Sequence, residues 1–245
     1  MWHKIICILV AILFIIMLVV KRFAYFRPTY DFMAPIETFH DIKEGNLHAW
    51  YKPGISGKVI LFCHGNAGNI SYRQNKLIEF LKMDHSVLIF DYSGFGQSSG
   101  VPSEQMCYSN ADMFISYLLR KGYKKHSIIP YGESLGAAVA AYVARKYSLP
   151  AVILEGGLPG IQRLIKFWYP KIGPVIGLVF NEFDTVSYLQ GYKGKIMVLH
   201  CVNDEIIPFK LSKEMSELAN VSIAMDGSHN MPIIPWSDVK EFISS

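Results

Sequence analysis

The most constraining feature of this chain is an alternation of short, uninterrupted apolar runs with longer helical stretches. Runs such as VILFC, VLIF, AVIL and IMVL are apolar at consecutive positions, which is typical of parallel strands buried on both faces. The predicted strands are residues 36–42, 46–52, 58–63, 86–91, 127–131, 151–155, 195–201 and 221–225. Predicted helices lie near residues 71–83, 103–121, 135–147, 210–219 and 236–243. This pattern predicts an α/β fold with a mostly parallel eight-stranded sheet and helices on both faces.

One residue opposes this arrangement. Pro130 falls inside the run 127–131, which the pattern places at the centre of the sheet, where proline removes a ladder hydrogen bond. It lies close to the end of that run, where the strand is leaving its neighbours. In sheets of this kind ligands bind at the carboxyl ends of the strands, so we expect the functional residues in the loops that follow them.

The first 28 residues differ from the rest of the chain. Residues 5–20 are 16 consecutive apolar residues, which would span about 24 Å as a helix, against about 30 Å for the hydrocarbon core of a bilayer. Trp2 and the aromatic residues after position 22 extend this run as interfacial anchors. A cleaved signal peptide is the alternative, but the run ends in Lys21-Arg22 without a small-residue cleavage site. We therefore expect residues 1–28 to be a retained single-pass anchor and residues 29–245 to form one domain.

The charge distribution argues against nucleic-acid binding. Residues 1–28 contain four basic residues and no acid, and the remaining residues hold 20 basic and 20 acidic side chains. A neutral domain lacks the basic surface that a phosphate backbone requires. Three of the four basic residues follow the apolar run, which slightly favours the cytosolic face, whereas sequons at Asn69 and Asn220 favour the opposite side. The side of the membrane stays open.

Cysteine usage does not indicate a disulfide framework. The four cysteines lie in the predicted anchor, in strand-like runs and in a predicted helix, and no Cys/His cluster has zinc-ligand spacing. We therefore expect small buried thiols, and no metal or organic cofactor.

The motif G-x-S-x-G occurs twice, so the motif alone does not identify a nucleophile. Ser134 in GESLG lies between the apolar run SIIPY and the helix-forming LGAAVAAYVARKY, and a strained strand–turn–helix of this kind lifts a serine hydroxyl off a sheet. Ser98 in GQSSG instead lies in the middle of a glycine-rich loop. Ser134 is therefore the predicted nucleophile.

A serine hydroxyl is a weak nucleophile unless an imidazole accepts its proton and an acid orients that imidazole. When the serine lies on a strand–turn–helix, the acid and then the histidine follow it along the chain. His229 and Asp204 each follow a late predicted strand and satisfy this order. His200 precedes the acid, so we assign it a structural role, and Glu155 is the alternative acid.

The oxyanion formed by serine attack requires backbone donors, each of which contributes about 2.7–4 kcal/mol to the transition state. The N–H of Leu135, directly after the nucleophile, is one predicted donor. The second is the N–H of Asn66, in the loop CHGNAGN that follows the predicted strand 58–63. We expect His64 to brace this loop and not to transfer protons.

Together, the segments HGNAGN, DYSGFGQSSG, GESLG, DEIIP and GSHN resemble the α/β-hydrolase superfamily. More narrowly, they resemble its membrane-anchored serine hydrolases of the bud-emergence type, which are kin to lysophospholipid lipases and protein depalmitoylases. The resemblance implies that Ser134, Asp204 and His229 form a catalytic triad. Cys201 and Ser228 stand where such proteins usually have glycine, which affects loop geometry and removes no reacting group.

An insert at about 157–193 occupies the position that carries the cap over the pocket in this fold. Its apolar residues either cover the sheet or form a small lid that holds an acyl chain near the membrane. An anchor also raises the local concentration of membrane substrates. The sequence therefore predicts a membrane-associated serine hydrolase that cleaves acyl ester or thioester bonds of lysophospholipid, monoacylglycerol or palmitoyl-protein type.

Two alternatives remain at this level. A serine aminopeptidase uses the same machinery, although a larger cap is then expected. A non-catalytic, membrane-tethered scaffold is disfavoured because the nucleophile, acid, base and oxyanion loop are all present. The natural substrate, its acyl-chain length and the oligomeric state stay open.

Overall fold

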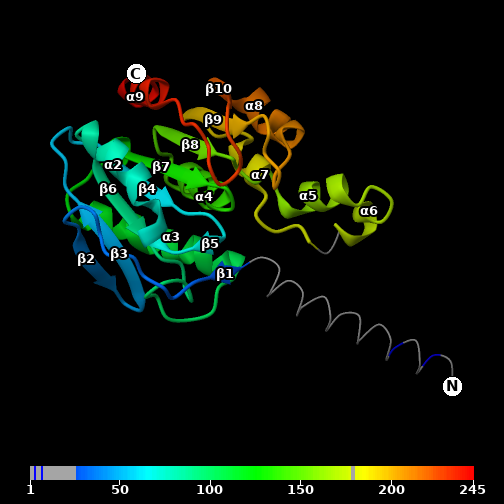
Figure 1. Ribbon diagram of the computed structural model, residues 1–245, viewed down its shortest axis with the longest axis horizontal. Helices are drawn as coiled ribbons and strands as arrows, with labels where there is room; N and C mark the ends of the chain where they lie inside the picture. Colours follow the sequence, from blue (N-terminus) through cyan, green and yellow to red (C-terminus); the bar gives the residue numbers. More distant parts are fainter. Residues whose placement is uncertain (1–2, 4–6, 8–25, 178–179) are drawn as a thin grey trace.

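The computed structural model describes residues 3, 7, 26–177 and 180–245, and it is built on an eight-stranded sheet in the order β10-β9-β8-β7-β4-β6-β3-β2 (Figure 1). The strands are β2 (His40–Glu44), β3 (Leu47–Lys52), β4 (Val59–Cys63), β6 (Ser86–Phe90), β7 (Ile128–Glu133), β8 (Ala151–Glu155), β9 (Lys195–Cys201) and β10 (Val221–Met225). β3 pairs antiparallel with β2 and with β6, and the other pairings of this sheet are parallel. The predicted α/β architecture is confirmed.

The first predicted strand, at 36–42, is displaced: β2 begins at His40. β2 and β3 form a hairpin whose turn contains Gly45 at a φ of 58°, and this turn sets the register that pairs His40 with Tyr51. The segment before His40 leaves the strand ladder: the ring of Phe39 stacks on Trp50 of β3, and the Ile36 N–H donates to the side-chain oxygen of Gln74. Apolar pattern alone could not locate that departure.

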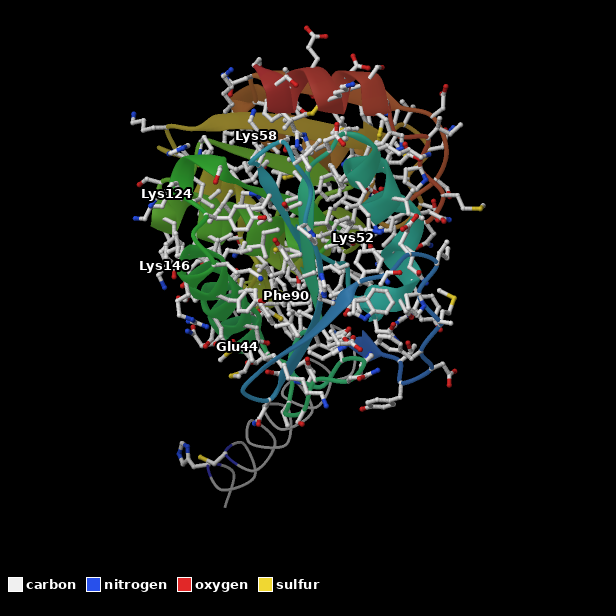
Figure 2. The ribbon with its side chains drawn as sticks, turned by 90° about the vertical axis from the view of Figure 1, so that its left-hand side faces the viewer. Glu44, Lys52, Lys58, Phe90, Lys124 and Lys146 are labelled. Atoms are coloured by element: carbon white, nitrogen blue, oxygen red, sulfur yellow. The ribbon has the colours of Figure 1, made fainter. Side chains whose placement is uncertain are left out.

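Helices cover both faces of the sheet, as predicted. One face carries α3 (Glu104–Arg120), α4 (Gly136–Tyr147), α7 (Thr185–Leu189) and α8 (Lys213–Leu218), and the other carries α2 (Gln74–Lys82) and α9 (Trp236–Ser244). Short 3₁₀ turns precede two of these helices and one strand: η1 (Ile70–Arg73) precedes α2, η2 (Lys125–Ser127) precedes β7, and η3 (Phe209–Ser212) precedes α8. Figure 2 shows the fully buried Phe90 of β6 in the interior and Lys124 and Lys146 at the outer edge.

Pro130 is accommodated within β7 by the register of its two neighbours. β7 pairs with β4 from Ile128 onward, but its pairing with β8 begins only at Tyr131. A residue without an N–H therefore lies one position before the second ladder starts, which reduces the cost of proline in a central strand.

The predicted insert 157–193 divides into two parts. α7 packs against α4 and belongs to the layer that covers the sheet, whereas α5 (Ile161–Trp168) and α6 (Gly173–Ile176) project from the body (Figure 1). Within the described ranges, no helix has the length and apolar character needed to cross a membrane. Of the predicted anchor at 1–28, the structure describes only residues 3, 7 and 26–28.

Candidate active site

Ser134 lies on the tight turn between β7 and α4. Its φ is 54°, in the left-handed region that non-glycine residues rarely adopt, and its N–H donates to the carbonyl of Glu155 at 2.9 Å. Gly132 lets β7 and α4 approach closely, since a Cβ there would overlap the backbone of Ala137. Gly136 lets the turn pack against the end of β4, since a Cβ there would overlap the carbonyl oxygen of Cys63. The turn therefore places the serine hydroxyl at the carboxyl edge of the sheet.

Ser98, in the second copy of the motif, has a different environment. It is only 5% exposed, and its hydroxyl donates to the carbonyl of Asp91 at 2.8 Å. The same hydroxyl accepts the backbone N–H of His48 at 2.9 Å. Both contacts are to backbone, so the Ser98 hydroxyl links its own loop to β3 and to the residue that follows β6.

The structure brings Ser134, His229 and Asp204 into one hydrogen-bonded series. Nε2 of His229 lies 2.9 Å from Oγ of Ser134, and Nδ1 of the same ring lies 2.7 Å from Oδ2 of Asp204. Gly156 lies beside the ring with a φ of 51°, a backbone conformation that favours glycine. The arrangement can move a proton from the hydroxyl to the imidazole beside a fixed negative charge.

The other contacts of Asp204 orient its carboxyl group and favour its charged form. Its Oδ1 accepts the backbone N–H groups of Ile206 at 2.9 Å and Ile207 at 2.7 Å. Burial opposes ionisation of this carboxyl group, but hydrogen bonds from His200, His229 and the Ile207 backbone outweigh that effect and hold the pKa of Asp204 well below its usual range. Asp204 is therefore a carboxylate that can hold the imidazole in one orientation, and His200 supports it.

The two predicted oxyanion donors lie on either side of the nucleophile turn. Leu135 follows Ser134 directly, and a Cβ built at Gly65, the residue before Asn66, would lie 3.3 Å from the Cβ of Ser134. Nδ1 of His64 lies 2.8 Å from the carbonyl oxygen of Gly65. Because the N–H of a trans peptide points away from its carbonyl, this hydrogen bond sets the direction of the Asn66 N–H. This hydrogen bond from His64 to the loop backbone agrees with the predicted role of His64 in holding the loop.

Stability should depend on pH through His64. Burial of its fully enclosed ring, together with the charge of Arg73, lowers the pKa of His64 from 6.5 to about 4. Between these values the unfolded chain binds more protons than the folded one, so this stability is complete above pH 6.5 and is lost as the pH falls toward 4. We expect the free energy of unfolding, measured in urea, to fall by roughly 2–3 kcal/mol over about two pH units. His64→Gln should flatten this profile, and an unchanged slope would assign it to other groups.

A buried charge cluster beside the nucleophile was not predicted. Arg73 Nη2 lies 2.7 Å from Glu133 Oε1, and Lys76 Nζ lies 2.6 Å from Glu133 Oε2 and 2.7 Å from Glu155 Oε1. The Tyr131 hydroxyl donates to Glu155. Burial opposes the charge of Glu133, but Arg73 and Lys76 outweigh it and hold the pKa of Glu133 well below its usual range. Glu155, the alternative acid, is therefore paired with Lys76.

The only local signal of this cluster was the carboxylate directly before the nucleophile. Arg73 and Lys76, its cationic partners, come from the segment after the oxyanion loop, 60 and 57 residues away from Glu133. Glu133 also accepts the backbone N–H of Gly65 at 3.3 Å. The cluster thus connects the strand that bears the nucleophile to the loop that bears Asn66.

Replacing Lys76 by methionine is expected to lower the free energy of unfolding by about 3–5 kcal/mol, because it leaves a buried carboxylate without its cation. Of the two carboxylates that Lys76 contacts, Glu155 is destabilised more, because its side chain is only 2% exposed. The deficit should shrink at acid pH, where protonation removes the uncompensated charge. Lys82→Met, which removes an exposed pair with Glu79, is the control and should cost at most about 1 kcal/mol. Equal losses in urea denaturation would contradict the expectation.

The described residues contain no group of three or more His, Cys, Asp or Glu side chains placed to hold a metal ion. All four cysteines are free thiols, and Cys63, Cys107 and Cys201 are buried. Burial raises the pKa of the Cys201 thiol to about 11.

The strand order, the nucleophile turn and the loops at the carboxyl edge define the class of α/β hydrolases. A family model for the alpha/beta hydrolase fold matches residues 58–173, and the chain belongs to the α/β-hydrolase superfamily. It is a hydrolase of that superfamily. An uncharacterized mimivirus protein is 33% identical over 74% of this chain and 69% of its own length. An uncharacterized membrane protein of Saccharomyces cerevisiae is 31% identical over 80% of this chain and 75% of its own length.

A third relative is named after its α/β-hydrolase domain. Alpha/beta hydrolase domain-containing protein 17B of Xenopus laevis is 29% identical over 62% of this chain, and the match spans 51% of that protein. Among solved structures, an esterase of Pyrococcus furiosus superposes with a TM-score of 0.72 at 16% identity, over 89% of this chain and 98% of the esterase. The thioesterase domain of the curacin biosynthetic pathway gives a TM-score of 0.61 at 12% identity, over 85% and 99%. These structural likenesses establish the fold.

Proposed function

We propose that this chain is a membrane-tethered serine hydrolase that cleaves acyl ester or thioester bonds through Ser134, His229 and Asp204. The observation that carries the proposal is the uninterrupted contact series from Asp204 to the Ser134 hydroxyl on a strained turn. A positive φ at the nucleophile is costly, and strain of this kind accumulates where it serves chemistry. No metal or organic cofactor is part of the proposal.

The reaction follows from the positions of these groups. Oγ of Ser134 bonds to the acyl carbon while His229 Nε2 takes its proton, and the carbonyl oxygen becomes an oxyanion facing the N–H groups of Leu135 and Asn66. The carbon–oxygen or carbon–sulfur bond to the leaving group then breaks, and His229 returns the proton to the departing alcohol or thiol. Water, deprotonated by the same ring, hydrolyses the acyl-serine ester and restores the hydroxyl.

An acylated substrate at a membrane agrees with three observations. The projecting α5–α6 segment exposes five large apolar side chains: Phe167, Trp168, Tyr169, Ile172 and Val175. Exposed tryptophan and tyrosine are typical of lipid interfaces. The yeast relative is described as a membrane protein, and this chain carries 16 consecutive apolar residues at 5–20. Lysophospholipid, monoacylglycerol and palmitoyl-protein are the substrate types that fit.

A fluorophosphonate probe tests the nucleophile, because it phosphonylates only an activated serine. We expect stoichiometric labelling of the folded chain, with mass spectrometry placing the adduct on the peptide that contains Ser134. Labelling on the peptide of Ser98, or no labelling of folded protein, would contradict the proposal, and the second result would favour the scaffold alternative.

A substrate panel tests the bond that is cleaved. It comprises p-nitrophenyl esters of increasing chain length, an acyl thioester and an aminoacyl amide. We expect hydrolysis of the ester and the thioester with a preference for longer chains. Turnover of the amide alone would favour the aminopeptidase alternative.

A further inference from the structure

Residues 26–36, here called the strap, run along the loop that follows β4. Within the strap, β1 (Arg27–Pro28) pairs in parallel with β5 (Ala67–Gly68), and Figure 1 shows the two labelled side by side. The N–H of Arg27 donates to the carbonyl oxygen of Asn66 at 3.2 Å. The strap therefore contacts the residue whose N–H is the proposed oxyanion donor.

The side chain of Asn69 joins the strap to the loop. It is fully buried, and its amide nitrogen donates to the carbonyl oxygens of Asp31 at 2.7 Å and Thr29 at 3.3 Å. Its Oδ1 accepts the backbone N–H of Ser71 at 3.0 Å and so caps η1. Because this nitrogen is enclosed and hydrogen-bonded, the sequon at Asn69 cannot receive a glycan in the folded protein.

Further contacts fasten both ends of the strap. At its start, the ring of Phe26 packs edge-on against the rings of Phe95 and Phe183, with centroids 6.1 Å away in each case. Toward its end, the N–H of Met33 donates to Oγ of Ser71 at 3.0 Å. The strap is thus held along its length and cannot slide independently of the loop.

The loop itself has little regular structure, so its backbone direction depends on what holds it. Two consecutive carbonyl groups next to the donor are held by different parts of the chain. His64 binds the carbonyl oxygen of Gly65, and Arg27 of the strap binds that of Asn66. Rotation of the Gly65–Asn66 peptide plane would turn the Asn66 N–H away from the oxyanion position, and the Arg27 hydrogen bond fixes the next plane, from Asn66 to Ala67, which anchors the other side of Asn66.

We propose that the strap is a positioning segment for the oxyanion loop. The segment that follows the apolar run at 5–20 then also determines the geometry at the reacting carbonyl. The inference rests on the proposed function, because it assigns the Asn66 N–H to the oxyanion. The strap does not contact the acyl group in the proposed reaction, so it acts through the loop. Loosening it should lower kcat by about 10–100-fold and leave KM nearly unchanged, since a displaced donor weakens the transition state more than the bound substrate.

The test compares three variants of the full chain. Asn69→Asp keeps the acceptor that caps η1 but replaces the buried amide donor with an oxygen that faces two carbonyl groups. Phe26→Ala removes the ring contacts at the start of the strap. Tyr30→Ala is the matched control, because Tyr30 belongs to the strap but is 74% exposed. For p-nitrophenyl ester hydrolysis, the first two should lower kcat by about 10–100-fold with KM within about twofold, and the control should match the wild type.

Amide hydrogen exchange over residues 64–70 gives a readout that is independent of catalysis. Exchange should accelerate in Asn69→Asp and Phe26→Ala, while circular dichroism shows that both remain folded. Unchanged exchange in both variants overturns the inference whether or not esters are hydrolysed. Faster exchange with wild-type kcat also overturns it, because the loop would then be loosened without effect on the donor. A wild type that hydrolyses neither esters nor thioesters refutes the proposed function, and exchange still shows whether the strap holds the loop.

Discussion

Ser134→Ala is expected to lower kcat for an acyl ester by about six orders of magnitude, because no other group at the site can form the acyl-enzyme. The hydroxyl is the only part of Ser134 that the substitution removes. Alanine is as compatible as serine with the φ of 54° at this turn, so the backbone should keep its geometry. The measurement is kcat on a p-nitrophenyl ester, with a thermal unfolding curve to confirm that the variant is folded.

Ser98→Ala is the matched control, since it removes a hydroxyl from the second copy of the same motif. Because the Ser98 hydroxyl links the Asp91 carbonyl to the His48 N–H, its loss should lower stability by about 1–3 kcal/mol while kcat of the folded protein changes little. If Ser98→Ala were inactive and Ser134→Ala retained activity, the assignment of the nucleophile would be wrong.

Asp204→Asn should lower kcat by about 10⁴ while the fold stays intact. The asparagine oxygen can still accept the backbone N–H groups of Ile206 and Ile207, which fixes its orientation. Its NH₂ group then faces Nδ1 of His229 in place of Oδ2. Nδ1 must accept that hydrogen bond, so the ring carries its proton on Nε2, where it can no longer take one from the serine.

The measurement for Asp204→Asn is kcat together with the rate of fluorophosphonate labelling, since both depend on proton transfer to His229. Asp226→Asn is the control: it removes a charge from an exposed side chain three residues before His229 and should leave kcat within a few-fold of the wild type. If Asp204→Asn left kcat unchanged and Glu155→Gln lowered kcat by about 10⁴, the acid would be Glu155. The Lys76 pairing of Glu155 argues against that result.

Most of the sheet could be predicted from the sequence because parallel strands have a local signal. A strand buried on both faces must be apolar at consecutive positions, and β6, β8 and β9 begin at the predicted residues. β10, an edge strand with alternating exposed and half-buried residues, also begins where it was predicted. The helices were predictable for a similar reason, since a helix that covers a sheet repeats its apolar residues at helical spacing. β2 was displaced because its register depends on a hairpin turn and on the contact of Ile36 with Gln74.

The charge cluster and the strap could not be predicted. Lys76 and Glu155 are 79 residues apart, and the residues around Lys76 do not distinguish it from a solvated lysine. The strap contacts the loop largely through its own backbone; for example, Asn69 donates to the carbonyl oxygen of Asp31. The residue types of the strap therefore do not indicate these contacts. Pairings of this kind appear only once two distant segments are placed against each other.

The sequence by itself determined the order of strands and helices along the chain, the tight turn that bears Ser134 and the kinds of residue in the loops at the carboxyl edge. These depend on apolar periodicity and on local backbone preferences, which act over a few residues. Only the tertiary structure decided that His229 meets Ser134, that Asp204 and not Glu155 reaches the imidazole, and that the strap lies against the Asn66 loop. Each of these outcomes is a distance between side chains or peptides far apart in sequence, and such a distance is set by the packing of the whole sheet.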